Sequence, residues 1–339
     1  MARIVMADDG IPFDGVSFEH GPLGGVETAF VSLAEALARR GHEVLVRNHC
    51  SRPVRHKGVD WARLEDGRPD RADLYIANRG DKLIPLMPGA RRRAFWIHNP
   101  ASYFMKPRYL IKLWRVRPTI VFLGPYHRAT YPWWAPRLPW VIIPYGIAEI
   151  FRGVPKPTSI PVPRAIFTSN PMRGLDWLLG LWTNRIRAAV PNAELHVFSG
   201  PSTYGGLKAT EMQPILDQAR ATPGVMVHEP VDKATLAREL AASRVMLYRG
   251  DLGEVFCLAL GEAQMVGVPC VVGKLGNVYE RIIDGETGYV AGDDESFVRS
   301  AISLLSDDAL WRSQHEAAWA KQRGLSWDVT AASFEKLIP

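Results

Sequence analysis

The stretch Val245–Val272, VMLYRGDLGEVFCLALGEAQMVGVPCVV, sets the fold because it contains one complete strand–loop–helix–strand unit. Val245–Tyr248 and Val268–Val272 are short apolar runs that predict buried strands, and Phe256–Met265 between them predicts a helix. Two buried strands joined through a helix are typical of a parallel α/β sheet. The stretch therefore predicts an α/β protein.

The same alternation of short apolar runs and helical periods extends along the rest of the chain. A helix opens at Gly24-Gly25, repeats apolar residues at helical spacing as far as Ala38, and ends at Gly41. Further strands are expected at 3–7, 43–47, 74–77, 94–97, 120–123, 140–143, 165–168, 194–198 and 225–228, with helices at 175–189 and 233–242. This order predicts two Rossmann-like halves facing a central cleft, with ligands at the carboxyl ends of the strands.

A proline-rich segment separates the two halves. Arg152–Arg164, RGVPKPTSIPVPR, holds four prolines in thirteen residues and is typical of a linker. We therefore expect a first domain at 1–152, a linker at 153–164 and a second domain at 165–319. A C-terminal helix at about 320–339 is expected to pack back on the first domain.

Composition narrows the class of protein. The chain has 339 residues, of which 47% are hydrophobic and 22% charged, as in globular proteins that fill two cores. No run approaches the roughly 18 apolar residues of a membrane-spanning helix, and no signal peptide precedes Asp8-Asp9. Three cysteines without metal-ligand spacing indicate neither a disulfide framework nor a zinc site. These features predict a cytoplasmic protein.

The net charge of +6 is unevenly distributed. Residues 82–148 contain eleven Lys or Arg, no Asp or Glu, and five tryptophans. This pattern suits a basic solvated face over a tryptophan-containing core, and it equally suits a surface that meets an anionic ligand or an anionic membrane at its inner face. Nucleic acid is not expected as a partner, because no nucleic-acid module accompanies the charge.

Glu254 and Glu262 are the acidic residues that bracket the apolar start of the predicted helix. Glu254 falls in the strand-to-helix loop, and the N–H groups of Phe256, Cys257 and Leu258 would be the unpaired donors of the helix N-terminus, which favours phosphate oxygens. With Glu254 before the helix N-terminus and Glu262 after it, the two carboxylates could each bind hydroxyl groups. This arrangement suits a ligand that has a hydroxyl-rich group at each end of a diphosphate. The spacing alone is also compatible with a helix-capping Glu and an exposed mid-helix Glu.

Three separated motifs resemble one family. GEVFCLALGEAQMVGVPCVV at 253–272 resembles the E-x7-E signature of the retaining family-4 glycosyltransferases of GT-B fold. NVYERIIDGETGYV at 277–290 and GGVETAFVSLAEALARRGHEVLV at 24–46 are similar to the family's later turn and strand and to its amino-terminal glycine loop and helix. Together the motifs cover both expected domains.

The resemblance implies roles for matching residues in the second domain. Glu254 would bind the transferred sugar, Glu262 the ribose, and the backbone at Val255, Phe256, Cys257 and Leu258 the diphosphate. Arg173 in the loop TSNPMRGLD matches the family's phosphate clamp. Ser169 and Asn170 stand where the family's upstream arginine is missing, and Arg249 is a candidate to replace it. Cys257 is a departure, because glycine is common there.

In the first domain, the resemblance places His98 at a strand end facing the transferred sugar, with Asn99 in place of the family's Asp. Gly24 and Gly25 would admit acceptor or phosphate by close backbone approach. GPLGGV is not a GxGxxG sequence, which argues against a dehydrogenase.

The resemblance implies transfer, with retention, of a hexose-type sugar from a nucleotide-diphosphate sugar to a hydroxyl of a glycan, a lipid-linked molecule or a small molecule. No cofactor and no metal are expected, since no Asp-x-Asp lies near these motifs. Two alternatives stay open: a nucleotide-sugar epimerase or hydrolase of the same fold, and a non-catalytic homologue that only binds the nucleotide sugar.

Overall fold

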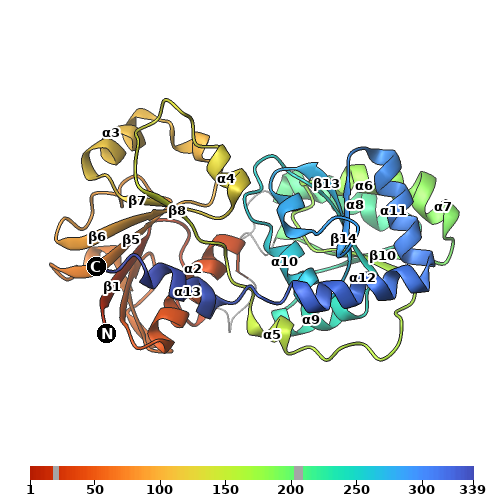
Figure 1. Ribbon diagram of the computed structural model, residues 1–339, viewed down its shortest axis with the longest axis horizontal. Coiled ribbons are helices and arrows are strands. Elements are labelled where there is room, and N and C mark those ends of the chain that lie inside the picture. Colours follow the sequence, from red (N-terminus) through yellow and green to blue (C-terminus); the bar gives the residue numbers. More distant parts are fainter. Residues whose placement is uncertain (18–22, 202–208) are drawn as a thin grey trace. The chain divides into compact units, whose positions relative to one another are not determined.

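The computed structural model describes residues 1–17, 23–201 and 209–339, and the chain divides into two compact units (Figure 1). Unit 1 comprises Met1–Gly146 and Leu325–Pro339, and unit 2 comprises Ile147–Gly324. The proline-rich segment 153–164 lies within unit 2, and the C-terminal helix α13 (Trp327–Glu335) belongs to unit 1.

Unit 1 is built on a sheet of eight strands in the order β3-β4-β2-β1-β5-β6-β7-β8. All neighbouring pairs are parallel except β3 and β4. The strands are β1 (Arg3–Asp8), β2 (Glu43–Asn48), β3 (Val54–His56), β4 (Val59–Arg63), β5 (Ala72–Asn78), β6 (Ala90–Trp96), β7 (Thr119–Phe122) and β8 (Trp140–Ile142). The strand order reverses between β1 and β5, so the carboxyl ends of these two strands form a switch point.

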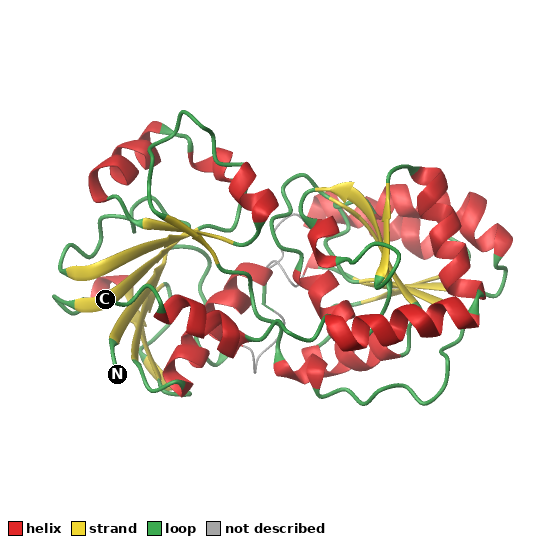
Figure 2. Ribbon diagram, in the orientation of Figure 1, coloured by secondary structure: helices red, strands yellow, loops and turns green. Residues whose placement is uncertain are grey.

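Helices cover both faces of this sheet (Figure 2). The alternation of side chains along β6 shows the two faces, since Phe95 packs on Phe104 while Trp96 packs on Phe334 of α13. The helical elements are α2 (Gly25–Arg39), η1 (Leu64–Asp66), η2 (Ala101–Phe104), α3 (Pro107–Val116), α4 (Pro125–Ala129) and α13. A Cβ at Gly146 would lie 2.3 Å from the backbone nitrogen of Trp327, so glycine permits α13 to pack there.

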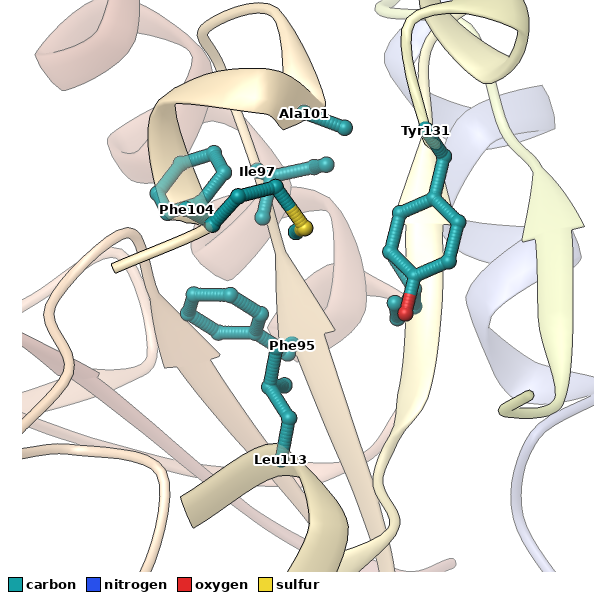
Figure 3. Close-up of a pocket in the computed structure, with 8 residues that line it drawn as sticks. Phe95, Ile97, Ala101, Phe104, Leu113 and Tyr131 are labelled. Carbon is teal, nitrogen blue, oxygen red and sulfur yellow. The ribbon is translucent and has the colours of Figure 1, made fainter. Parts of the chain in front are cut away.

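One apolar pocket lies in the core of unit 1, beneath η2 and α3. Figure 3 shows side chains from both elements around it, with Tyr131 opposite. Its lining comprises Phe95, Ile97, Ala101, Phe104, Met105, Leu113, Ile120 and Tyr131, and these side chains leave no room for a water molecule between them. The pocket is therefore part of the packed core.

Unit 2 is built on a fully parallel sheet in the order β11-β10-β9-β12-β13-β14. The strands are β9 (Arg164–Phe167), β10 (Glu194–Phe198), β11 (Val225–His228), β12 (Val245–Gly250), β13 (Cys270–Leu275) and β14 (Gly288–Ala291). This is the doubly wound order in which ligands bind where the direction of winding changes, here between β9 and β12. The predicted α/β fold with two Rossmann-like halves is confirmed.

The helices of unit 2 follow the expected alternation, and those at Glu149–Arg152, Ala209–Ala221 and Asp294–Ser306 are additional to the predicted ones. In chain order, the helices are α5 (Glu149–Arg152), α6 (Leu175–Leu181), the π-helix η3 (Trp182–Ile186), α7 (Arg187–Ala189), α8 (Ala209–Ala221), α9 (Lys233–Ala241), α10 (Leu258–Met265), η5 (Val278–Arg281), α11 (Asp294–Ser306) and α12 (Asp308–Lys321). The helix predicted at 175–189 is therefore interrupted by a π-helical turn. The predicted start of α10 at Phe256 is wrong, because the backbone of Cys257 is left-handed, with φ of 55°, and the helix begins at Leu258, two residues after the predicted start.

In the part of the chain that the structure describes, no helix combines the length and the apolar character that crossing a bilayer requires.

Candidate functional site

Glu254 is the centre of a polar cluster at the switch point of unit 2. It lies in the loop after β12, its side chain is buried, and it is held by the loop hydrogen bond from its N–H to the carbonyl of Asp251. Its Oε2 accepts a hydrogen bond from Arg173 Nη1 at 2.5 Å and another from the Tyr248 hydroxyl at 2.6 Å. Both partners compensate the cost of burying the carboxylate.

Tyr248 joins this cluster to the loop after β9. Its side chain is fully buried at the end of β12, and its oxygen accepts a hydrogen bond from Ser169 Oγ at 3.2 Å. Burial, together with the charge of Glu254, raises the pKa of the Tyr248 phenol well above its ordinary value. The phenol therefore stays protonated and donates a hydrogen bond to the carboxylate of Glu254.

The loop after β9 presents Arg173 through a tight turn. Asn170 Oδ1 accepts from the N–H of Met172 at 2.9 Å, and the Asn170 carbonyl accepts from the N–H of Arg173 at 3.0 Å. Gly174 follows with φ of 89°, and a Cβ there would lie 3.0 Å from the Cβ of Arg249. Arg249 is exposed and stacks on Trp177, its guanidinium carbon 5.3 Å from the ring centroid. Of the four predicted residues in these two loops, Arg173 contacts Glu254 directly and Ser169 reaches it through Tyr248.

Glu262 forms a second buried ion pair, on α10. Its Oε1 accepts a hydrogen bond from Lys233 Nζ at 2.5 Å, and the exposed fractions of the two side chains are 6% for Glu262 and 38% for Lys233. Asp232, the N-cap of α9, accepts from the N–H of Thr235 at 2.9 Å and fixes the turn that carries Lys233. The alternative of an exposed mid-helix Glu262 is excluded by its burial.

The N-terminus of α10 lies between the two carboxylates in the sequence, and its donors are shifted from the prediction. The first-turn N–H groups belong to Leu258, Ala259 and Leu260, not to Phe256 and Cys257, which precede the helix. The side chains of Val255, Phe256 and Cys257 are buried. Arg281 covers the Phe256 ring at 4.5 Å. Burial raises the pKa of the Cys257 thiol well above its ordinary value, so the thiol stays neutral.

In unit 1, His98 is part of a buried network at the carboxyl ends of β1, β5 and β6. Its Nδ1 contacts the Tyr145 hydroxyl and its Nε2 contacts Asn78 Oδ1. Burial, and then the charge of Arg79, hold the pKa of His98 well below its ordinary value. A neutral ring with the proton on Nε2 satisfies both contacts, because Asn78 Oδ1 only accepts and Tyr145 can donate.

The network continues through two acids and an arginine. Asn78 Nδ2 donates to Asp8 Oδ2 at 2.5 Å, and Arg79 donates to both oxygens of Asp8 at 3.0 and 3.1 Å. Arg79 Nη2 also donates to Glu27 Oε1 at 2.8 Å, on the first turn of α2. The ring of His98 is thus fixed by a hydrogen-bonded chain that reaches the start of α2.

The remaining predicted residues of unit 1 lie near the start of α2 and the end of β6. Gly24 is the N-cap of α2 and Gly25 its first residue. A Cβ at Gly24 would lie 2.4 Å from Glu27 Oε2, so glycine makes room for the Glu27 carboxylate. Asn99 is exposed, and its carbonyl accepts a hydrogen bond from His127 Nε2 at 2.9 Å.

Sequence reasoning missed Tyr248, Lys233 and the group Asp8, Asn78 and Arg79. Tyr248 looked like the last residue of an apolar strand, and Lys233 like an ordinary helix-start lysine. The strand-end position of Asp8 and Asn78 was the available signal, since carboxyl ends of neighbouring parallel strands meet at one edge. Within 1–17, 23–201 and 209–339, no three His, Cys, Asp or Glu side chains are grouped to hold a metal ion.

Comparison with known proteins finds similar sequences for part of the chain. Residues 163–307 match the family model "Glycosyl transferases group 1". Over 85 residues the chain is 40% identical to N-acetyl-alpha-D-glucosaminyl L-malate synthase of Bacillus anthracis, a match that covers 24% of this chain and 22% of the synthase. The match thus spans less than a quarter of that relative's length.

Solved structures match over the whole chain. Sucrose-phosphate synthase from Thermosynechococcus elongatus is similar with a TM-score of 0.75, 15% identity and coverage of 99% of this chain and 98% of that one. Anabaena HepE in complex with UDP-glucose is similar with a TM-score of 0.72, 13% identity and coverage of 99% of each chain. The chain therefore has the GT-B fold, and residues 163–307 resemble the group 1 glycosyltransferases, which confirms the predicted resemblance to glycosyltransferases of this fold.

Proposed function

We propose that this protein is a retaining glycosyltransferase that moves a hexose-type sugar from a nucleotide-diphosphate sugar to an acceptor hydroxyl without a metal ion. The observation that carries the proposal is the arrangement around Glu254, where a buried carboxylate is held by Arg173 and Tyr248 through one oxygen. The group 1 glycosyltransferase match and the UDP-glucose complex of a protein with the same fold support it.

Glu254 is assigned to the transferred sugar. Arg173 and Tyr248 both bind Oε2, and Oε1 is the oxygen assigned to accept a hydrogen bond from a sugar hydroxyl. A carboxylate whose orientation is already fixed loses little entropy when the sugar binds. Glu254 is thus a positioning group for the donor sugar.

Arg173 is assigned to the leaving diphosphate. Its guanidinium has five N–H donors, so the bond to Glu254 is compatible with further bonds to phosphate oxygens. The charge that develops on the diphosphate is stabilised by this cation and by the first-turn N–H groups of α10. Arg249 lies beside the same loop and adds a second cation in place of the upstream arginine that the family pattern has.

Glu262 is assigned to the ribose. Its ion pair with Lys233 fixes the carboxylate on α10, next to the helix end that faces the phosphates. In the proposed reaction the departing diphosphate oxygen helps to deprotonate the acceptor on the same face of the sugar. His98 is neutral and hydrogen-bonded through both ring nitrogens, so its assigned part is to shape the sugar pocket and not to act as a base.

The decisive experiment combines donor binding with turnover. Thermal unfolding with UDP, GDP, ADP and their sugars identifies the donor, because a nucleotide at about 100 times its Kd stabilises the fold by roughly 2.7 kcal/mol. Transfer and donor hydrolysis are then measured for wild type, Glu254→Gln and Arg173→Gln, with the exposed Glu295→Gln as the matched control.

We expect Arg173→Gln to lower turnover by about 10²–10³-fold, Glu254→Gln to lower it strongly while nucleotide binding persists, and Glu295→Gln to match the wild type. Full turnover by Glu254→Gln would contradict the assignment. Nucleotide binding without any turnover would favour the non-catalytic homologue, and release of an epimerised free sugar would favour the epimerase.

A further inference from the structure

Helix α3 carries apolar side chains on its outer surface as well as its inner one. Tyr109 and Leu113, four residues apart, are buried in the core of unit 1. Ile111 and Trp114 are exposed on the other side, and the Trp114 side chain has an exposed fraction of 67%. The core of unit 1 does not use these two side chains, so their exposure requires another explanation.

The segment from Tyr131 to Ile142 adds more exposed apolar side chains beside α3. Trp133 has an exposed fraction of 92%, and Trp134, Trp140 and Ile142 are also exposed. Arg117, at the end of α3, donates to the carbonyl of Arg137 at 3.1 Å, and the apolar pocket is lined by both Leu113 and Tyr131. Figure 1 shows α3 and the chain before β8 along the same side of unit 1.

The exposed apolar side chains of α3 and of residues 131–142, together with the cations of the same segments, are here called the basic aromatic surface. Arg108, Lys112 and Arg115 follow one another at helical spacing on α3, and Arg128 stacks on Trp140 at 4.8 Å. The cations of the surface are Lys106, Arg108, Lys112, Arg115, Arg117, Arg128 and Arg137. Lys112 and Arg108 contact Asp81, while residues 82–148 contain no acidic side chain that could neutralise the others.

We propose that the basic aromatic surface docks unit 1 on an anionic lipid bilayer. Tryptophan side chains favour the interface between headgroups and acyl chains, and isoleucine favours the acyl chains. The surrounding lysines and arginines match the negative potential of anionic lipid. A purely polar anion such as a soluble nucleotide or glycan would pair with the cations but would leave Ile111 and Ile142 exposed to water. The proposal is independent of the proposed transfer reaction.

The test is co-sedimentation of the full chain with vesicles of phosphatidylcholine alone and of phosphatidylcholine with phosphatidylglycerol. Two variants probe the surface: Trp133→Ser/Trp134→Ser removes apolar contacts, and Arg115→Gln/Arg137→Gln removes charge. All four side chains are exposed, so the fold is preserved, and circular dichroism checks this. Val162→Ser/Val329→Ser and Arg52→Gln/Arg220→Gln are the matched controls on exposed positions elsewhere.

We expect binding to the anionic vesicles only, weakening as salt is raised. Each arginine removed should lower partitioning roughly five-fold, and the tryptophan pair should lower it more, while both controls bind like the wild type. The proposal is overturned if the wild type does not bind anionic vesicles at low salt, or if it binds neutral vesicles equally well. It is also overturned if the two surface variants bind anionic vesicles as tightly as the control variants do. Retention on an anionic polysaccharide without vesicle binding would also overturn it.

Discussion

Lys233 Nζ donates to Glu262 Oε1 across 2.5 Å, which ties the first turn of α9 to the middle of α10 within unit 2. The pair is asymmetric, because the carboxylate is buried and the ammonium group is partly exposed. Loss of the lysine and loss of the glutamate should therefore have different effects on stability.

We predict that Lys233→Met lowers the free energy of unfolding by about 1–3 kcal/mol, because it leaves a buried carboxylate unpaired. Glu262→Gln should cost less, and the double variant should be more stable than Lys233→Met alone. Urea denaturation of the four proteins gives the coupling energy. Additive effects would show that the two side chains do not interact in solution. If Glu262 holds the ribose, Glu262→Gln also weakens nucleotide binding.

Tyr248→Phe tests the second donor to Glu254. The substitution keeps the packing of a buried ring and removes its hydrogen bond, so it should lower the free energy of unfolding by about 1–2 kcal/mol. In the proposed reaction it should lower kcat/KM several-fold and leave the Kd for the free nucleotide unchanged. Tyr289→Phe on β14 is the control. An unchanged kcat/KM would mean that Arg173 alone orients the carboxylate.

The left-handed backbone of Cys257 predicts a ranking of substitutions. With φ of 55°, glycine meets no steric cost there, alanine meets about 1 kcal/mol, and the β-branched valine meets more. We expect thermal stability to fall in the order Cys257→Gly, Cys257→Ala, Cys257→Val, with at least about 2 kcal/mol between the first and the last. Equal stability of the glycine and valine variants would be inconsistent with the left-handed conformation.

Two buried histidines of unit 1 predict a loss of stability in mild acid. Burial lowers the pKa of His127 to about 4 and holds the pKa of His98 well below its usual value, while in the unfolded chain both lie near 6.5. Below about pH 6.5 the unfolded state binds more protons, so stability falls as the pH decreases from 6.5 towards 4.

The free energy of unfolding of wild type and His127→Gln at pH 7, 5.5 and 4.5 checks this prediction. The variant should be less stable at pH 7, because Asn99 and Leu123 lose their partner. Its stability should fall less steeply with acid. Parallel curves for the two proteins would refute the assignment to His127.

Glu335 predicts a second, more acidic transition. Its hydrogen bond with Arg40 lowers the pKa of Glu335 to about 2, and His42 is a further partner, so α13 is tied to α2 and β2. This stabilisation is complete above the unfolded pKa near 4.3 and is lost as the pH falls towards 2. Glu335→Gln should cost about 1–2 kcal/mol at pH 7, and the difference from wild type should vanish near pH 2, as followed by urea denaturation.

The order of strands and helices could be predicted because parallel α/β proteins bury their strands on both faces. Runs such as Glu194–Phe198 and Val225–His228 match the observed strands residue for residue. The hairpin β3–β4 was missed, because its short strands are half polar and lie at the sheet edge. The start of α10 was misplaced because backbone conformation at Cys257 depends on tertiary packing that periodicity does not report.

The candidate site could be predicted only in part. Glu254, Glu262 and Arg173 were found because they stand in recognisable motifs. Their partners Tyr248 and Lys233 were not, since one is 6 and the other 29 residues from its carboxylate and each contact exists only in the folded sheet. The chain from Tyr145 through His98 to Glu27 likewise joins residues from separate strands and a helix, and no local pattern indicates it.

The position of α13 has a consequence for synthesis of the chain. Unit 2 is a continuous segment, Ile147–Gly324, inserted between Gly146 and the last residues of unit 1. On the ribosome, unit 2 is therefore made in full before α13 emerges to cover Trp96 and to pair with Arg40. One face of the sheet of unit 1 stays incompletely covered until α13 has been made. Unit 1 can therefore complete its folding only after the whole of unit 2 has been synthesised, although unit 2 is not part of the core of unit 1.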